Sequence, residues 1–190
     1  YMPVRIFKNV GGNLKEVTQE AGLSKTNGWW NRLAIADVNS DGFPDIVAGN
    51  HGLNSRFQSS AEKPVSMYVG DFDNNGRIEQ IVTSYNKEKA YPMVLRHDLL
   101  AALPYLKKKY LKYASYKEEG IEDIFSPEQL KKAHRLDMYV QQSSVFLNGQ
   151  NGTFTRKSLP TEAQFSPMYG IAVEDFDGDG CADILMGGNF

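Results

Sequence analysis

DFDGDGCAD, residues 175–183, has aspartates at positions 1, 3, 5 and 9 and glycines at positions 4 and 6. Alternating carboxylates on a tightly curled loop can direct their oxygens at one centre, and glycine permits the positive φ values that such curling requires. Ligands that are all oxygens favour a hard cation, and a flexible site with this many carboxylates suits Ca²⁺ better than Mg²⁺. The stretch therefore predicts a calcium loop.

The loop differs from an EF-hand, although its first half matches the EF-hand start D-x-[DN]-x-[DN]-G. An EF-hand joins two long helices and needs a bidentate glutamate at position 12, where this chain has Met186. The flanking segments YGIAVE and ILMGG are short, apolar and β-prone. We therefore expect a loop between two strands, in which Asp183 at position 9 replaces the missing glutamate.

The same spacing recurs in DVNSDGFPD (37–45) and DFDNNGRIE (71–79), again with glycine at position 6. Acidic β-turns are the alternative interpretation, because Asp, Asn and Gly favour turns, but three loops in one frame favour up to three Ca²⁺ sites. Position 7 has no shared side-chain chemistry, so we interpret it as a backbone carbonyl ligand. The predicted ligands are Asp37, Asn39, Asp41, Phe43 and Asp45 in the first loop, Asp71, Asp73, Asn75, Arg77 and Glu79 in the second, and Asp175, Asp177, Asp179, Cys181 and Asp183 in the third.

A second unit also repeats, because IFKNVGGNLKEVT (6–18) parallels VFLNGQNGTFTRKS (145–158). Phe7 lies 30 residues before Asp37, and Phe146 lies 29 residues before Asp175. We therefore expect each four-stranded unit to contain an F-x-N hairpin followed by a calcium-loop hairpin. Repeated four-stranded units indicate a β-propeller. The predicted fold class is all-β with a helical insertion, as a partial β-propeller of four-stranded antiparallel blades.

These residues resemble the FG-GAP/VCBS repeats, the calcium-loop blades of integrin α-subunit propellers and of many bacterial surface proteins. The third loop matches best, with Tyr169-Gly170 in place of FG and Met186-Gly187-Gly188 in place of GAP. The first loop is a good match and the second is degenerate. The wider context is similar to bacterial VCBS proteins of the type associated with ASPIC/UnbV domains. The resemblance covers essentially the whole chain and implies an exported protein that is periplasmic, outer-membrane-associated or extracellular.

The length of 190 residues is too short for a whole propeller of this kind. At about 60 residues per blade, and with a long insertion, residues 1–190 are expected to hold two to three blades of one propeller, as a fragment. Such a fragment would leave strand edges and apolar blade faces uncovered near residues 1–18 and 170–190. We therefore expect self-association through these terminal blades.

The β pattern lapses after the second loop, and residues 90–142 are predicted to form a helical insertion within the propeller. Ser126, Pro127 and Gln129 suit the N-cap, N1 and N3 positions of one helix, and Asp98 is a candidate cap for an earlier one. An apolar helical face is expected from Leu99, Leu100, Leu103, Leu106, Tyr110 and Tyr113.

The lysines of this insertion raise the question of nucleic-acid binding. Between Arg96 and Val140 there are nine basic and seven acidic side chains, which is typical of a charged face in water. No RNP-like aromatic signature or strongly basic stripe accompanies the lysines, so we expect no nucleic-acid partner.

Catalysis is not predicted, because the three histidines form no Ser/His/Asp or Cys/His arrangement by spacing. Trp29 and Trp30 can stack on a sugar or pack between blades. The single cysteine forms no intrachain disulfide, and no apolar run of 18 residues predicts a membrane span. We expect a non-enzymatic, calcium-stabilised binding or scaffolding module of an exported or cell-surface protein, with a protein or glycan partner. The alternative is a carbohydrate-binding or polysaccharide-degrading propeller.

Overall fold

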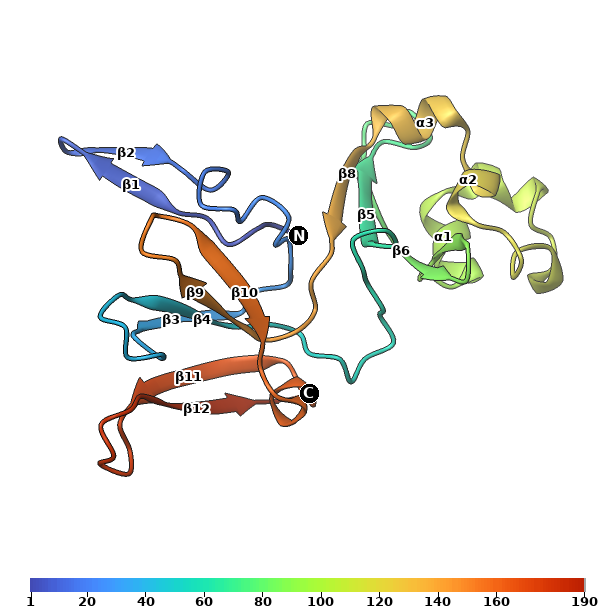
Figure 1. Cartoon of the computed structure of the whole chain (residues 1–190). Coiled ribbons are helices and arrows are strands. Elements are labelled where there is room, and N and C mark those ends of the chain that lie inside the picture. The colour runs from blue at the N-terminus through green and yellow to red at the C-terminus, as the bar shows by residue number, and fades with distance from the viewer. Residues whose placement is uncertain (190) are drawn as a thin grey trace. The chain divides into compact units, whose positions relative to one another are not determined.

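The computed structural model describes residues 1–189. Their regular secondary structure consists mostly of strands, with small helical segments (Figure 1). The chain divides into two compact units. Unit 1 contains Tyr1–Arg56 together with the residues from Met138 onward, and unit 2 contains Phe57–Asp137. Within the described residues, no helix has the length and apolar character needed to cross a membrane.

Unit 1 contains one four-stranded antiparallel sheet with the order β10-β9-β4-β3. Its strands are β3 (Arg32–Ala36), β4 (Asp45–Gly49), β9 (Ser144–Asn148) and β10 (Phe154–Ser158). The F-x-N hairpin β9–β10 therefore pairs with the hairpin of the first acidic loop, in the register Ile46↔Phe146. The expected order was wrong for this sheet, because the acidic-loop hairpin comes first in the chain and the F-x-N hairpin follows it.

Two further hairpins complete the strands of unit 1. β1 (Phe7–Val10) pairs with β2 (Asn13–Glu16), and β11 (Met168–Glu174) pairs with β12 (Asp183–Gly188). Each forms a two-stranded sheet of its own rather than part of a four-stranded one. A short 3₁₀ helix, η3 (Thr161–Gln164), precedes β11.

The core of unit 1 explains why β9 pairs with β4. Phe146 is fully buried and packs with Ile46 and Ala48 of β4, and the group is completed by Val4 and Leu23 from the N-terminal segment. At the end of β4, the buried Asn50 donates hydrogen bonds to residues about ninety positions later: its backbone N–H donates to Ser143 Oγ at 3.0 Å and its Nδ2 to the Val140 carbonyl at 2.8 Å. Apolar burial and this satisfied polar contact together fix the long-range pairing.

Unit 2 contains the second four-stranded sheet, with the order β7-β6-β5-β8. Its strands are β5 (Val65–Gly70), β6 (Glu79–Asn86), β7 (Lys89–Pro92) and β8 (His134–Met138). The neighbouring pairs β5–β6 and β6–β7 are antiparallel. The last strand in sequence thus lies at the edge beside β5, because the chain returns to the sheet after its helical segments.

Helical segments occupy the middle of unit 2, over a narrower range than the predicted 90–142. They are α1 (Arg96–Ala102), η1 (Pro104–Lys108), η2 (Tyr113–Ser115), α2 (Ile121–Ile124) and α3 (Pro127–Lys132). The ends of the predicted range belong instead to β7 and β8, whose backbone groups pair within the sheet.

The helix caps confirm one prediction and correct another. The Gln129 N–H donates to Ser126 Oγ at 3.3 Å, and the Ser126 N–H donates to Gln129 Oε1 at 2.9 Å, so α3 begins with the expected capping box. Asp98 is not a cap, because α1 begins after Leu95 and Asp98 lies in its first turn.

The core of unit 2 forms from the predicted apolar face of the insertion and the sheet. Of the six expected residues, all except Tyr113 are buried, and Tyr113 is 52% exposed. They pack with Phe72, which precedes β6, and with Ile81 of β6. The helical segments therefore share one core with the hairpin that carries the second acidic loop.

Candidate metal centres

Each acidic loop joins the two strands of a hairpin, as the sequence predicted. The first lies between β3 and β4, the second between β5 and β6, and the third between β11 and β12. Positions 1 to 9 below refer to the nine residues of each loop, which start at Asp37, Asp71 and Asp175.

The position-1 aspartate organises the backbone of all three loops. One of its oxygens accepts the N–H of position 5 and the other accepts the N–H of position 6, at distances between 2.7 and 3.1 Å. Hydrogen bonds from N–H to carboxylate are among the stronger ones in proteins. The loop is thus curled around the first carboxylate, and the remaining lone pairs of its oxygens are available to coordinate a cation.

Three further hydrogen bonds repeat in the same positions. The position-5 N–H donates to the position-3 side chain, the position-7 N–H to position 5, and the position-2 N–H to the position-9 carboxylate. These distances lie between 2.7 and 3.3 Å. Three loops of different composition therefore share one scheme of five hydrogen bonds. This shared scheme is stronger evidence that they have the same function than the sequence spacing alone.

The backbone enters the left-handed region twice in each loop. Position 6 is always glycine, with φ between 83° and 87°. Position 4 also has positive φ, but only the third loop has glycine there; Ser40 has a φ of 58° and Asn74 a φ of 57°. Asparagine adopts the left-handed region more readily than most residues, whereas Ser40 gives no such signal in the sequence.

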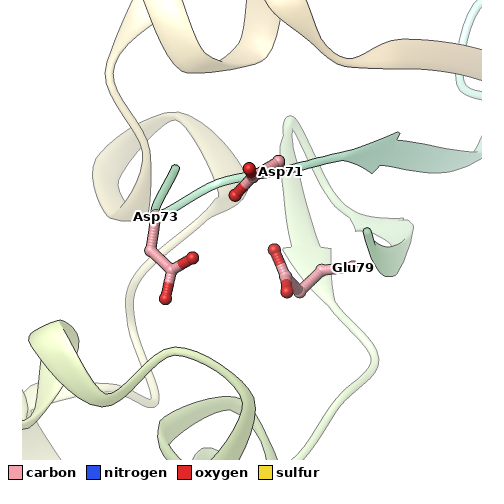
Figure 2. Close-up of side chains that lie close together, drawn as sticks. All are labelled: Asp71, Asp73 and Glu79. Atoms are coloured by element: carbon pink, nitrogen blue, oxygen red, sulfur yellow. The ribbon is translucent and has the colours of Figure 1, made fainter. Parts of the chain in front are cut away.

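Carboxylates at positions 1, 3 and 9 converge in two of the loops. One oxygen from each of Asp71, Asp73 and Glu79 lies within 4.8 Å of the other two, and Figure 2 shows the three side chains around a common space. In the third loop, Asp175, Asp177 and Asp183 come together in the same way, and they stand at positions 1, 3 and 9. Asp179, at position 5, does not join that cluster.

The first loop forms no cluster of three carboxylates within residues 1–189. Its position 3 is Asn39, so only Asp37 and Asp45 stand at the converging positions. Asp45 is fully buried, and its two oxygens accept the Val38 N–H at 3.1 Å and the Asn148 N–H at 2.7 Å. Asp45 thus ties the loop to β9, a structural role that the sequence did not reveal.

The two carboxylate clusters differ in burial. Asp71, Asp73 and Glu79 are half-buried, whereas Asp175 and Asp177 are exposed. The position-2 side chains differ in the same sense, since Phe72 is 2% exposed and Phe176 is 55% exposed. The second loop is therefore the more shielded from water, although its sequence departs furthest from the repeat.

Backbone hydrogen bonds favour the ionised form of two loop carboxylates, Asp71 and Asp41. The N–H of Gly76 is the main cause of a lowered pKa at Asp71, and the N–H of Phe43 is the main cause of a lowered pKa at Asp41. The charge of Asp179 raises the pKa of the Cys181 thiol, so the only soft donor nearby stays protonated. The available donors are therefore charged oxygens, which fit a hard cation such as Ca²⁺.

The position-7 residues Phe43, Arg77 and Cys181 turn their N–H groups to the position-5 side chain at 2.7 to 2.9 Å. Their carbonyls remain predicted ligands.

The tryptophans differ in their surroundings. Trp30 donates its Nε1–H to the Thr26 carbonyl at 2.9 Å and its ring meets Phe146 edge-on, so it packs against the core of unit 1. Trp29 is half-buried and makes edge-on contacts with Tyr1 and His51. Burial lowers the pKa of His51, which favours the neutral imidazole.

Comparison with known proteins gives a family but no individual relative. The sequence profile of the FG-GAP-like repeat family matches residues 1–48 and 120–186, which together exceed half of the chain. Searches of curated proteins and of solved structures gave no match. The matched ranges include the first and third loops, and the second loop lies outside them. Hairpins with repeated acidic loops, four-stranded antiparallel sheets and this match lead to one conclusion: the chain belongs to the FG-GAP-like repeat family.

Proposed function

We propose that the chain is a non-enzymatic, calcium-stabilised binding or scaffolding module of an exported or cell-surface protein. The observation that carries this proposal is the common scheme of five hydrogen bonds, which directs carboxylates at one point in two separate loops. The positions of these loops between paired strands favour a structural ion over a catalytic one, because a single hairpin supplies the charged ligands.

The clustered carboxylates of the second and third loops determine where an ion would bind and how it would affect stability. Asp71, Asp73 and Glu79 would hold one ion, and the equivalent aspartates of the third loop would hold another. Three carboxylates within 4.8 Å of one another repel, and a divalent cation offsets that repulsion. Calcium binding would therefore stabilise the hairpins in the folded state. Open carboxylate loops suit the high calcium concentration outside the cytoplasm, which supports an exported location.

The test is thermal unfolding of the chain in calcium and in chelator. Asp177→Asn removes a charge from the third cluster but keeps an oxygen for the Asp179 N–H. We expect a lower Tm for this variant in calcium and little change in chelator. Glu20→Ala, an exposed acid outside the loops, is the matched control and should change neither value. Equal losses for Asp177→Asn in both conditions would reject the metal role.

Carbohydrate binding is the second candidate, and it depends on Trp29. Trp30 packs against the core, so of the two tryptophans it is the half-buried Trp29, with His51 beside it, that offers its ring to a sugar. Glycan-array binding that is lost in Trp29→Ala would favour this function over protein scaffolding.

A further inference from the structure

A groove on unit 2 combines positive charge with apolar surface. Its volume is about 410 Å³, which is within the range of binding pockets. It lies along α1 and the segment that follows η1. The residues that line it are Arg96, His97, Leu100, Ala101, Lys107 and Leu111.

The walls of the groove are fixed to each other by Arg96. Its Nε donates to the Tyr110 carbonyl at 2.8 Å and its Nη2 donates to the Leu111 carbonyl at 2.9 Å. Leu100, which is 5% exposed, joins the groove to the core. The groove is therefore largely formed before any partner arrives, which reduces the entropy cost of binding.

Most of the charge around the groove is not neutralised by the rest of the unit, although Lys109 pairs with Glu119 at 3.7 Å. Residues 96–113 contain five Lys or Arg and a single acid, Asp98, which pairs with His97 at 3.2 Å. The hydrogen-bond partners of Arg96 are neutral carbonyls, so they do not offset its charge. Within residues 1–189, Lys107, Lys108 and Lys112 form no ion pair with a carboxylate. The near balance of charges over the whole insertion thus conceals a basic segment at this groove.

The apolar part of the groove is also open. Leu111 is 76% exposed, although burial of a leucine side chain is worth about 2 kcal/mol. An exposed leucine beside unpaired lysines selects a ligand that has both an apolar group and negative charges.

We infer that this groove binds an acidic peptide segment of a partner protein, with one apolar side chain inserted between Leu100 and Leu111 and carboxylates near Lys107. A polyanionic sugar has no apolar anchor to fill the groove. Stacking of single-stranded bases would need broad aromatic surfaces, and no Phe, Tyr or Trp lines this groove. The inference rests on the proposed binding function and names its class of partner.

The experiment measures fluorescence anisotropy of a labelled peptide, Glu-Asp-Glu-Leu-Leu-Glu-Asp-Glu, against the full chain at low salt. Lys107→Glu should weaken binding about tenfold, because it reverses a charge at the groove. Leu111→Gln should weaken it about fivefold through lost apolar contact. Both side chains are exposed, so the fold should persist. Lys131→Glu and Leu53→Gln are the matched controls, since both residues are exposed and lie outside the groove, and they should bind as the wild type does.

Three outcomes would overturn the inference. The first is equal affinity for a peptide with serines in place of the leucines. The second is tighter binding of heparin, an RNA oligonucleotide or phosphatidylglycerol vesicles, lost in the same two variants. The third is peptide binding that neither groove variant weakens. Calcium-dependent stabilisation is measured on the same samples, so a failed peptide experiment with an intact calcium response would reject the docking and leave the metal role standing.

Discussion

The glycine at position 6 of each acidic loop is required by its backbone conformation rather than by space. Gly180 has a φ of 87° and a Cβ built on it meets no atom within 4 Å. We predict that Gly180→Ala costs about 1 kcal/mol of unfolding free energy, because an L side chain disfavours the left-handed region. Gly187 lies in the same hairpin and has equal room but no positive φ. Urea unfolding in chelator should show no loss for Gly187→Ala; an equal loss in both variants would contradict the backbone explanation.

For individual residues, the sequence predicted which carboxylates converge better than it predicted which side chains are buried. The tripeptide Asp-Phe-Asp occurs at 71–73 and at 175–177, and in both loops the two aspartates reach a carboxylate cluster. The phenylalanine between them is buried in one loop and exposed in the other. Local spacing determines which oxygens converge, but burial depends on what distant segments place beside the loop. The buried role of Asp45 depends on Asn148 in the same way and could not be predicted from nearby residues.

At the scale of elements, the second loop is joined to the helical segments through Phe72. Its N–H donates to Glu79 Oε2 at 3.0 Å, its carbonyl accepts from Gln129 Nε2 at 2.7 Å, and its ring lies 4.5 Å from that of Phe125 between centroids. A residue of the acidic loop thus belongs at once to a candidate metal site and to the core of unit 2. Changes in one are expected to affect the other.

We predict that Phe72→Ala destabilises unit 2 by about 3–5 kcal/mol, because it removes a buried aromatic ring and leaves a cavity. Phe176→Ala is the matched control, at the same loop position with a ring that is 55% exposed. It should cost well under half as much. Thermal unfolding followed by circular dichroism at 222 nm measures both, and similar losses would show that the environment of the ring is not what matters.

Element types and their pairing were not equally predictable. Strands around the acidic loops and the capping box of α3 follow from local patterns, and both are present. β8 lies within the range 90–142 that the sequence predicts to be helical, but the return of the chain to the sheet makes these residues a strand. The pairing of β9 with β4 joins segments about one hundred residues apart. No local pattern encodes such a partner.

Over the whole molecule, apolar side chains remain uncovered on two hairpins of unit 1. Val10 and Leu14 of β1–β2 are 54% and 70% exposed, and Leu185 of β12 is 61% exposed. We predict that the chain of residues 1–190 self-associates through these hairpins, because exposed strands and apolar faces recruit further chains. Light scattering should give a mass that rises with concentration and falls towards the monomer in Leu14→Lys/Leu185→Lys. Leu53→Lys, also exposed, is the control, and a wild-type monomer at every concentration would contradict the prediction.

The pairing of β4 with β9 has a consequence for synthesis on the ribosome. The bond from the Asn148 N–H to Asp45 joins residues 103 positions apart. At typical translation speeds, β4 is synthesised about 5–20 s before β9. Unit 2 is made in this interval and has its own core, so it can fold while the edge of β4 is still open to chaperones or to other nascent chains. The insertion therefore delays the pairing of β4 with β9 during synthesis. The rate at which codons 50–143 are translated thus affects the assembly of this sheet.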